Sequence, residues 1–236
     1  MKTAFSRRKL RAAMALLAIL GIPVLACLIC RPLVNSTWYQ MSCDGLGIVG
    51  DGFLLEALGI ERHAPPRGFP IEDLLLDELA FPEAWEVGGD PYNPEDRLPA
   101  EQIALTLFAD ASECPTSLIT AHDVYRFYGG ARCADMGYRT KTLAWFTTWE
   151  GYDSWSPPTE LSYQSPVASR FRLDCCTRQG GSLSICQAVG QYEEYVVRFH
   201  TSVDPGHPEC MSFVDLERIL AAIDERMALY LGKDTQ

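Results

Sequence analysis

Residues 169–200, with the sequence SRFRLDCCTRQGGSLSICQAVGQYEEYVVRFH, decide the fold of this chain. Apolar and other side chains alternate from Ser169 to Cys176, as they do in a strand that buries one face. The Gly180-Gly181 pair then signals a turn, and two further alternating runs follow it. The stretch therefore predicts three strands joined by short turns into an antiparallel meander.

The register of the first hairpin predicts a disulfide. Matching the apolar faces places Leu173 opposite Val189, and the same register places Cys176 opposite Cys186. The Cβ atoms of directly opposed residues lie about 4.5 to 5.5 Å apart, which is near the range of a disulfide. We therefore favour a Cys176–Cys186 bridge over two unpaired strand thiols, and we expect Cys175 to face the other side of the sheet.

A helix is predicted at the end of the chain. Apolar residues recur at three- and four-residue steps from Phe213 to Tyr230, after a candidate N-cap at Ser212 and before a candidate stop at Gly232. This apolar helix face has to be buried, and the meander is the nearest sheet in the sequence.

The first half of the body has weaker signals. Residues 71–81 predict a short helix or turn, 103–108 and 124–128 are strand candidates, and 129–146 predicts a second amphipathic helix. The order of these elements indicates an α+β fold, in which helices pack on an antiparallel sheet as in an α/β/α sandwich.

The N-terminal segment differs from the body in charge and hydropathy. Six of the 20 basic residues and no acids lie in residues 1–34, so residues 35–236 carry 14 basic and 31 acidic residues, a net charge of −17. Residues 12–30 are 19 uncharged residues, and a helix of that length spans about 28 Å, close to the thickness of a bilayer. Because five basic residues precede this transmembrane or signal helix and only Arg31 closely follows it, we expect the N-terminus in the cytoplasm and the body outside it.

Three fates are open for this segment. It can stay as a single-pass anchor, it can be a secretory signal cleaved near Ala26, or it can resemble a lipobox in which Cys27 becomes lipidated. Each fate leaves the body extracytoplasmic. The predicted organisation is a stub and anchor or signal at 1–34, a juxtamembrane linker at 35–68 and an extracytoplasmic domain at 69–236.

Cysteine usage agrees with an oxidising compartment, because seven of the nine cysteines lie beyond the apolar segment. Cys114 and Cys133 are disulfide candidates beside the predicted hairpin bridge.

The most suggestive surface is an aromatic segment at residues 145–158. Aromatic rings on a proline-bearing loop can stack on a sugar or a peptide, so Trp145, Trp149, Tyr152 and Trp155 are the candidate binding residues. We favour the alternative, a loop that folds back over the sheet edge and buries these rings.

Motifs of catalysis are missing from the sequence. It has no GxSxG elbow, HExxH helix or P-loop, so we predict no catalytic residues, metal or cofactor. The acidic balance argues against nucleic acid as a partner. The expected function is non-enzymatic binding of a small ligand or an envelope protein. The alternative is an envelope enzyme or a thiol- or metal-handling protein that uses the residues Cys175, His200, His207 and Cys210.

The order of several features along the chain resembles that of a known family. They are the tether, the Leu74-Leu75-Leu76 segment before Phe81-Pro82, the meander around Cys176 and Cys186, the Val196-Val197 strand and the terminal helix. In this arrangement the body resembles PsbP/Mog1-type α/β/α sandwiches, including the extracellular sensor domains of mycobacterial serine/threonine kinases and related lipoproteins. The resemblance implies the same kind of sandwich and supplies no catalytic residues.

Overall fold

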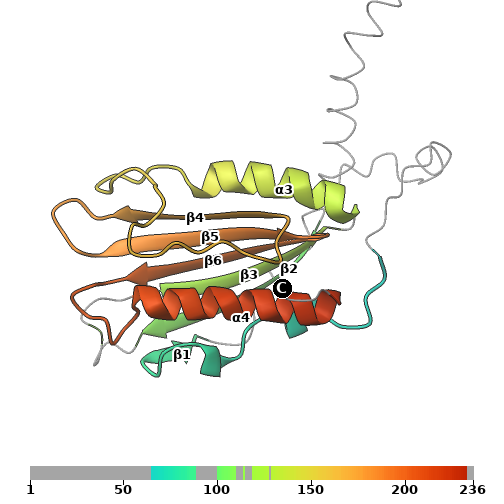
Figure 1. Cartoon of the computed structure of the whole chain (residues 1–236), viewed down its shortest axis with the longest axis horizontal. Coiled ribbons are helices and arrows are strands. Elements are labelled where there is room, and N and C mark those ends of the chain that lie inside the picture. The colour runs from blue at the N-terminus through green and yellow to red at the C-terminus, as the bar shows by residue number, and fades with distance from the viewer. Residues whose placement is uncertain (1–64, 89–99, 110–113, 115–118, 128, 233–236) are drawn as a thin grey trace, which may run out of the picture. The chain divides into compact units, whose positions relative to one another are not determined.

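The structure is a computed structural model that describes residues 65–88, 100–109, 114, 119–127 and 129–232 (Figure 1). The chain divides into two units, Met1–Gly47 and Ile48–Gln236, and every described residue belongs to the second. The predicted span, the lipidation candidate Cys27 and most of the predicted linker lie outside the described residues. Within these described ranges, no helix is both long and apolar enough to cross a bilayer.

A six-stranded antiparallel sheet forms the centre of the second unit. Its strand order is β1-β2-β3-β6-β5-β4, so the C-terminal meander pairs through β6 with β3. The strands are β1 (Trp85–Val87), β2 (Ala100–Ala109), β3 (Ile119–Phe127), β4 (Arg170–Thr177), β5 (Ser184–Tyr192) and β6 (Tyr195–Val203). The predicted α+β class with an antiparallel sheet is confirmed.

In the described part of the chain, four helical segments accompany the sheet. They are the 3-10 turns η1 (Ile71–Leu74) and η2 (Glu78–Ala80) and the helices α3 (Gly130–Trp145) and α4 (Phe213–Leu231). Figure 1 shows α3 and α4 on different sides of the strands. Both long helices were expected from their apolar periodicity, and the predicted 71–81 turn is the η1–η2 pair.

Local chemistry fixes both ends of α4. The Ser212 hydroxyl accepts a hydrogen bond from the Asp215 N–H at 3.1 Å, and the Asp215 carboxylate accepts from the Ser212 N–H at 3.1 Å. This reciprocal capping box satisfies two backbone donors that the first turn leaves free. Gly232 ends the helix in the left-handed region, with φ of 65°, where a side chain would add strain.

The face of the sheet under α4 buries the main apolar core. Apolar strand residues on this face pack against the apolar face of α4 and against the η1–η2 segment. Large members of this core are Leu107, Phe199, Met211, Leu216, Ile219 and Met227. Burial of this area supplies the main driving force for the fold, at about 25 cal/mol per Å² of apolar surface.

The opposite face of the sheet packs against α3. The helix contacts β5, β3 and β6, and it approaches closely at Gly137, where an added Cβ would lie 2.1 Å from the Phe127 ring. The centre of the sheet is therefore covered on both sides, and all nine residues of β5 are buried.

This two-sided cover corrects the predicted hairpin register. Cys175, not Cys176, lies opposite Cys186, and the two form a disulfide with a Cα–Cα distance of 4.0 Å. The prediction assumed a single apolar face. Because both faces of β5 are buried, Val189 can face α3 while its neighbour Ala188 faces α4, so apolar matching does not fix the register.

The two other disulfide candidates are both bonded. Cys114 bonds to Cys210, with a Cα–Cα distance of 5.8 Å, and Cys133 is disulfide-bonded as well. Cys176 is a buried free thiol on the α3 side of the sheet. Spacing along the sequence gave no information on these long-range pairs, because the fold alone brings Cys114 to Cys210.

Candidate functional site

Polar side chains on the α3 side of the sheet form the candidate site. In an antiparallel sheet, directly opposed residues share a face, so the register defines rows that cross the strands. One row is Arg172, Val189, Arg198, Asp123 and Ala104, and the next is Asp174, Gln187, His200, Ala121 and Thr106. We call Asp123, Lys141, Arg172, Asp174, Gln187, Arg198 and His200 the polar cluster.

Arg198 on β6 connects the two rows. Its Nε donates a hydrogen bond to Gln187 Oε1 at 2.8 Å, and its Nη1 lies 3.4 Å from Asp123 Oδ2. Its guanidinium carbon is 4.9 Å from the centre of the Trp145 ring. Burial is the main influence on Asp123 and raises the pKa of its carboxyl group, which the positive charges of Arg198 and Lys141 partly oppose.

Arg172 holds the other carboxylate of the cluster. Its Nε donates to Asp174 Oδ2 at 2.8 Å, and its guanidinium carbon lies 4.0 Å from the centre of the Phe146 ring. Each acid of the polar cluster is therefore paired with an arginine. Lys141 supplies the additional positive charge.

Lys141 reaches the cluster from α3. Its ammonium group lies 3.8 Å from the centre of the Tyr125 ring and 5.1 Å from that of Trp145. Burial lowers the pKa of Lys141 to about 8. The aromatic faces stabilise the ammonium ion where water is excluded. Because its pKa stays above 7, Lys141 remains largely charged at neutral pH.

Two buried polar atoms of the cluster lack hydrogen-bond partners. Gln187 Nε2 and His200 Nε2 are unpaired within the described part of the chain, and the two residues are directly opposed on β5 and β6. Gln187 is 1% exposed, and because its Oε1 accepts from Arg198, its amide N–H groups are the free donors. A buried donor without a partner costs about 1–3 kcal/mol, so this pair calls for an explanation.

The predicted aromatic residues lie next to this pair. The Trp149 ring centre is 6.2 Å from that of His200, and Trp149 makes edge contacts with Tyr152 at 5.9 Å and with Trp155 at 5.7 Å. Trp145 lies above Tyr125, at 5.7 Å between ring centres. The structure thus brings all four predicted aromatic residues to the α3 side, with Tyr152 and Trp155 in contact with Trp149.

The aromatic segment also covers a sheet edge, as the alternative interpretation expected. Ser156 exchanges backbone hydrogen bonds with Cys175 of β4 at 2.8 and 3.0 Å, and Tyr152 forms a bridge to Arg178. This pairing protects an edge strand. Trp149 nevertheless remains 37% exposed, so covering the edge does not bury its ring.

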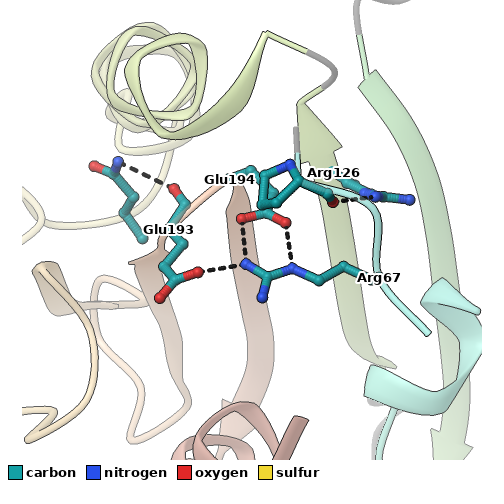
Figure 2. Close-up of polar contacts among 6 residues, drawn as sticks. Arg67, Arg126, Glu193 and Glu194 are labelled. Carbon is teal, nitrogen blue, oxygen red and sulfur yellow. Dashed lines mark hydrogen bonds and ion pairs between the residues drawn. The ribbon is translucent and has the colours of Figure 1, made fainter. Parts of the chain in front are cut away.

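A second charged cluster shows what a satisfied group looks like in this molecule. Figure 2 shows the Arg67 guanidinium against the turn between β5 and β6, where Nε and Nη2 donate to Glu194 at 2.7 and 2.8 Å and Nη2 also contacts Glu193. Arg126 Nη2 donates to the Pro65 carbonyl at 3.1 Å, whereas Arg126 Nε is buried without a hydrogen-bond partner in the described part of the chain. These contacts fasten the residues before η1 to the sheet, and we interpret them as structural.

A buried carboxylate on α4 is satisfied in the same way. Asp224 accepts hydrogen bonds from the hydroxyl groups of Tyr163 at 2.5 Å, Tyr192 at 2.6 Å and Ser165 at 2.7 Å. Three donors on one buried acid hold the 163–168 segment against the helix, and no donor is left over for a ligand.

The structure does not support a thiol or metal site at the residues named for the predicted alternative. Cys175 and Cys210 are both disulfide-bonded, so neither offers a thiolate. His207 contacts Glu209 at 3.1 Å, and among the described residues no three His, Cys, Asp or Glu side chains are placed to hold a metal ion.

Sequence reasoning missed most of the polar cluster. Only His200 was considered there, and it was assigned to a metal site. The signal was present in the strands, since Arg172, Asp174, Gln187 and Arg198 are polar residues in a meander with too many apolar residues for a single buried face. Such polar residues inside a sheet covered on both sides indicate a site.

Comparison with known proteins gives little more. No family model and no curated protein matches the chain. Among solved structures, the chain is similar to the extracellular domain of PknH from Mycobacterium tuberculosis, with 12% sequence identity and a TM-score of 0.45, over 71% of this chain and 99% of that domain.

Proposed function

We propose that this chain is a tethered, non-enzymatic extracytoplasmic domain that binds a small ligand at the polar cluster and the aromatic segment. The observation behind this proposal is the unpaired Gln187 and His200 nitrogens beside the exposed Trp149 ring. A ligand that supplies hydrogen-bond partners to these atoms would remove the cost of burying them. Trp149 would provide apolar contact area at the same place.

The ionisable groups near the site favour binding over catalysis. Burial lowers the pKa of His200 to about 4, so the imidazole is neutral at physiological pH and a weak base. Burial raises the pKa of the Cys176 thiol to about 11, so this cysteine stays protonated and is a poor nucleophile.

The location outside the cytoplasm is supported by the cysteines. The Cys114–Cys210 and Cys175–Cys186 bridges suit an oxidising compartment. Alkylation of denatured, unreduced protein from its native membrane should leave these four cysteines unmodified, as measured by peptide mass. Full modification before reduction would contradict the proposed location.

Binding can be tested by ¹⁹F NMR on the full chain in detergent, with 5-fluorotryptophan in place of tryptophan. The probes are glucuronate, glucose, benzoate, benzyl alcohol and benzylamine at millimolar concentration. We expect at least one of them to shift the signals of Trp149 and Trp145. Single Trp→Phe variants assign the signals.

Trp85 is an internal control for this experiment. Its ring is buried in the α4-face core, where Nε1 donates to the Cys210 carbonyl, so a ligand on the α3 side should not shift its signal. If no probe shifts Trp149, or if Trp85 shifts as much as Trp149, the proposed binding site is wrong.

A further inference from the structure

We infer that the ligand of this site is a carboxylic acid attached to a ring, with the carboxylate accepting from Gln187 and the ring lying against Trp149. This inference rests on the proposed function and specifies the chemical class of its ligand. Three independent features of the site lead to it: the donors, the charge and the aromatic surface.

The free donors require an acceptor. The Gln187 amide cannot turn its oxygen toward the ligand without losing the 2.8 Å hydrogen bond from Arg198, so it offers only N–H groups. The neutral imidazole of His200 can donate from Nε2 as well. Two neighbouring donors fit the two oxygens of a carboxylate, and an ionised acceptor roughly doubles the strength of such hydrogen bonds.

The charges around the donors favour one negative charge. Within the polar cluster, Arg172 pairs with Asp174 and Arg198 pairs with Asp123, which leaves Lys141 as its one excess positive charge. A phosphate group with two charges would need additional cations, because both arginines of the cluster already pair with an acid. A cationic ligand would leave the Gln187 donors unpaired.

The aromatic surface calls for a ring beside the carboxylate. Trp149 is held by edge contacts with Tyr152 and Trp155, and it remains 37% exposed beside His200. A rigid, partly exposed indole contacts the face of a flat or chair-shaped ring with little loss of side-chain entropy. Both a sugar acid and an aryl acid have this combination of groups.

The decisive variant is Gln187→Glu. Glutamate has nearly the same shape and still accepts from Arg198, but it replaces the N–H donors by a negative oxygen that repels a carboxylate. In the ¹⁹F experiment we expect glucuronate or benzoate to bind wild type more tightly than glucose or benzyl alcohol. The variant should weaken carboxylate binding about tenfold or more. Because the new carboxylate is buried directly opposite Asp174, the Tm should fall, and binding is compared well below the Tm of the variant.

Gln179→Glu is the matched control, because it adds the same charge on the exposed turn between β4 and β5. It should leave the affinities unchanged. Tighter binding of glucuronate than of benzoate would indicate a sugar acid as the natural ligand, and the reverse order would indicate an aryl acid.

Two results would overturn this inference in distinguishable ways. If glucose or benzyl alcohol binds at Trp149 as tightly as the matching acid, or if Gln187→Glu leaves carboxylate binding unchanged, the site exists but its ligand is not a carboxylate. If none of the five probes shifts Trp149, the binding site itself is wrong.

Discussion

The two faces of the sheet bury different chemistry. Under α4, the β6 side chains of Val197 and Phe199 lie in a large apolar core. Under α3, the alternate β6 residues Arg198 and His200 belong to the polar cluster, where two buried nitrogens lack partners. Apolar burial stabilises a fold, whereas unpaired polar burial destabilises it. The α4 face also has an unpaired buried nitrogen, His122 Nε2, but there it lies beside Phe199 in the apolar core, whereas Gln187 and His200 are opposed to each other among charged side chains. We therefore interpret the α4 face as the one that holds the domain together and the α3 face as the one kept polar for another purpose.

The largest expected effect is on the α4 face. Phe199→Ala removes a ring that is 1% exposed and stacks near Phe81, at 6.3 Å between ring centres. The cavity and the lost transfer energy should reduce the free energy of unfolding by roughly 3–5 kcal/mol, measured by urea denaturation. A loss below about 1 kcal/mol would mean that this face is not the main core.

Breaking the satisfied ion pair should have the next largest effect. Arg67→Met leaves Glu194, which is 1% exposed, as a buried charge without its arginine. Removing one partner of such a pair should cost about 3 kcal/mol by the same measurement. Arg218→Met is the control, because its contact with Asp215 is exposed and should be worth less than about 1 kcal/mol. Equal losses in the two variants would contradict a structural role for the Arg67 contacts.

Acid should destabilise both faces through one histidine on each. Burial lowers the pKa of His122 on the α4 face to about 3 and that of His200 on the α3 face to about 4, and Arg226 and Arg198, respectively, add to the shifts. Both folded-state values lie below the ordinary 6.5, so the unfolded chain binds more protons as the pH falls. The contribution of the two neutral histidines to the free energy of unfolding is therefore fully present above about pH 6.5 and is lost as the pH falls toward their folded-state pKa values.

Single variants can separate these two contributions. His122→Phe and His200→Phe should each reduce the slope of unfolding free energy against pH, between about pH 6.5 and 4.5, by about one proton. The double variant should reduce it by about two. An unchanged slope in His200→Phe would mean that this imidazole is more exposed to solvent than its position suggests.

At neutral pH, His200→Phe tests whether the polar side chains of the α3 face lower the stability of the domain. Phenylalanine replaces an imidazole with an unpaired nitrogen beside Trp149, so the variant should be more stable by about 1 kcal/mol. His207→Phe, on the C-terminal side of β6, should change stability by less than about 0.5 kcal/mol. A less stable His200→Phe variant would show that the imidazole has a structural role.

The same contrast explains how much the sequence could predict. The meander and α4 were predictable, because alternation, capping at Ser212 and a stop at Gly232 are local signals. The register at Cys175 and Cys186 was not, because it depends on α3 covering the second face. The aromatic segment could be identified from composition. The polar strand residues were visible as a signal, but their grouping was not, since the members of the polar cluster come from α3, β3, β4, β5 and β6 and meet only in the folded sheet.

The smallest expected change in stability belongs to Trp149→Ala. The ring is 37% exposed and packs mainly on other rings of its own loop, while β4 holds this loop through backbone hydrogen bonds that the substitution leaves intact. The free energy of unfolding, measured by urea denaturation, should therefore change by no more than about 0.5 kcal/mol. Binding of the carboxylate probe, read from the ¹⁹F signal of Trp145, should nevertheless weaken clearly. This variant separates the two faces: Phe199→Ala should impair folding, whereas Trp149→Ala should impair binding in a folded domain. A large loss of stability in Trp149→Ala would instead make the aromatic segment part of the core.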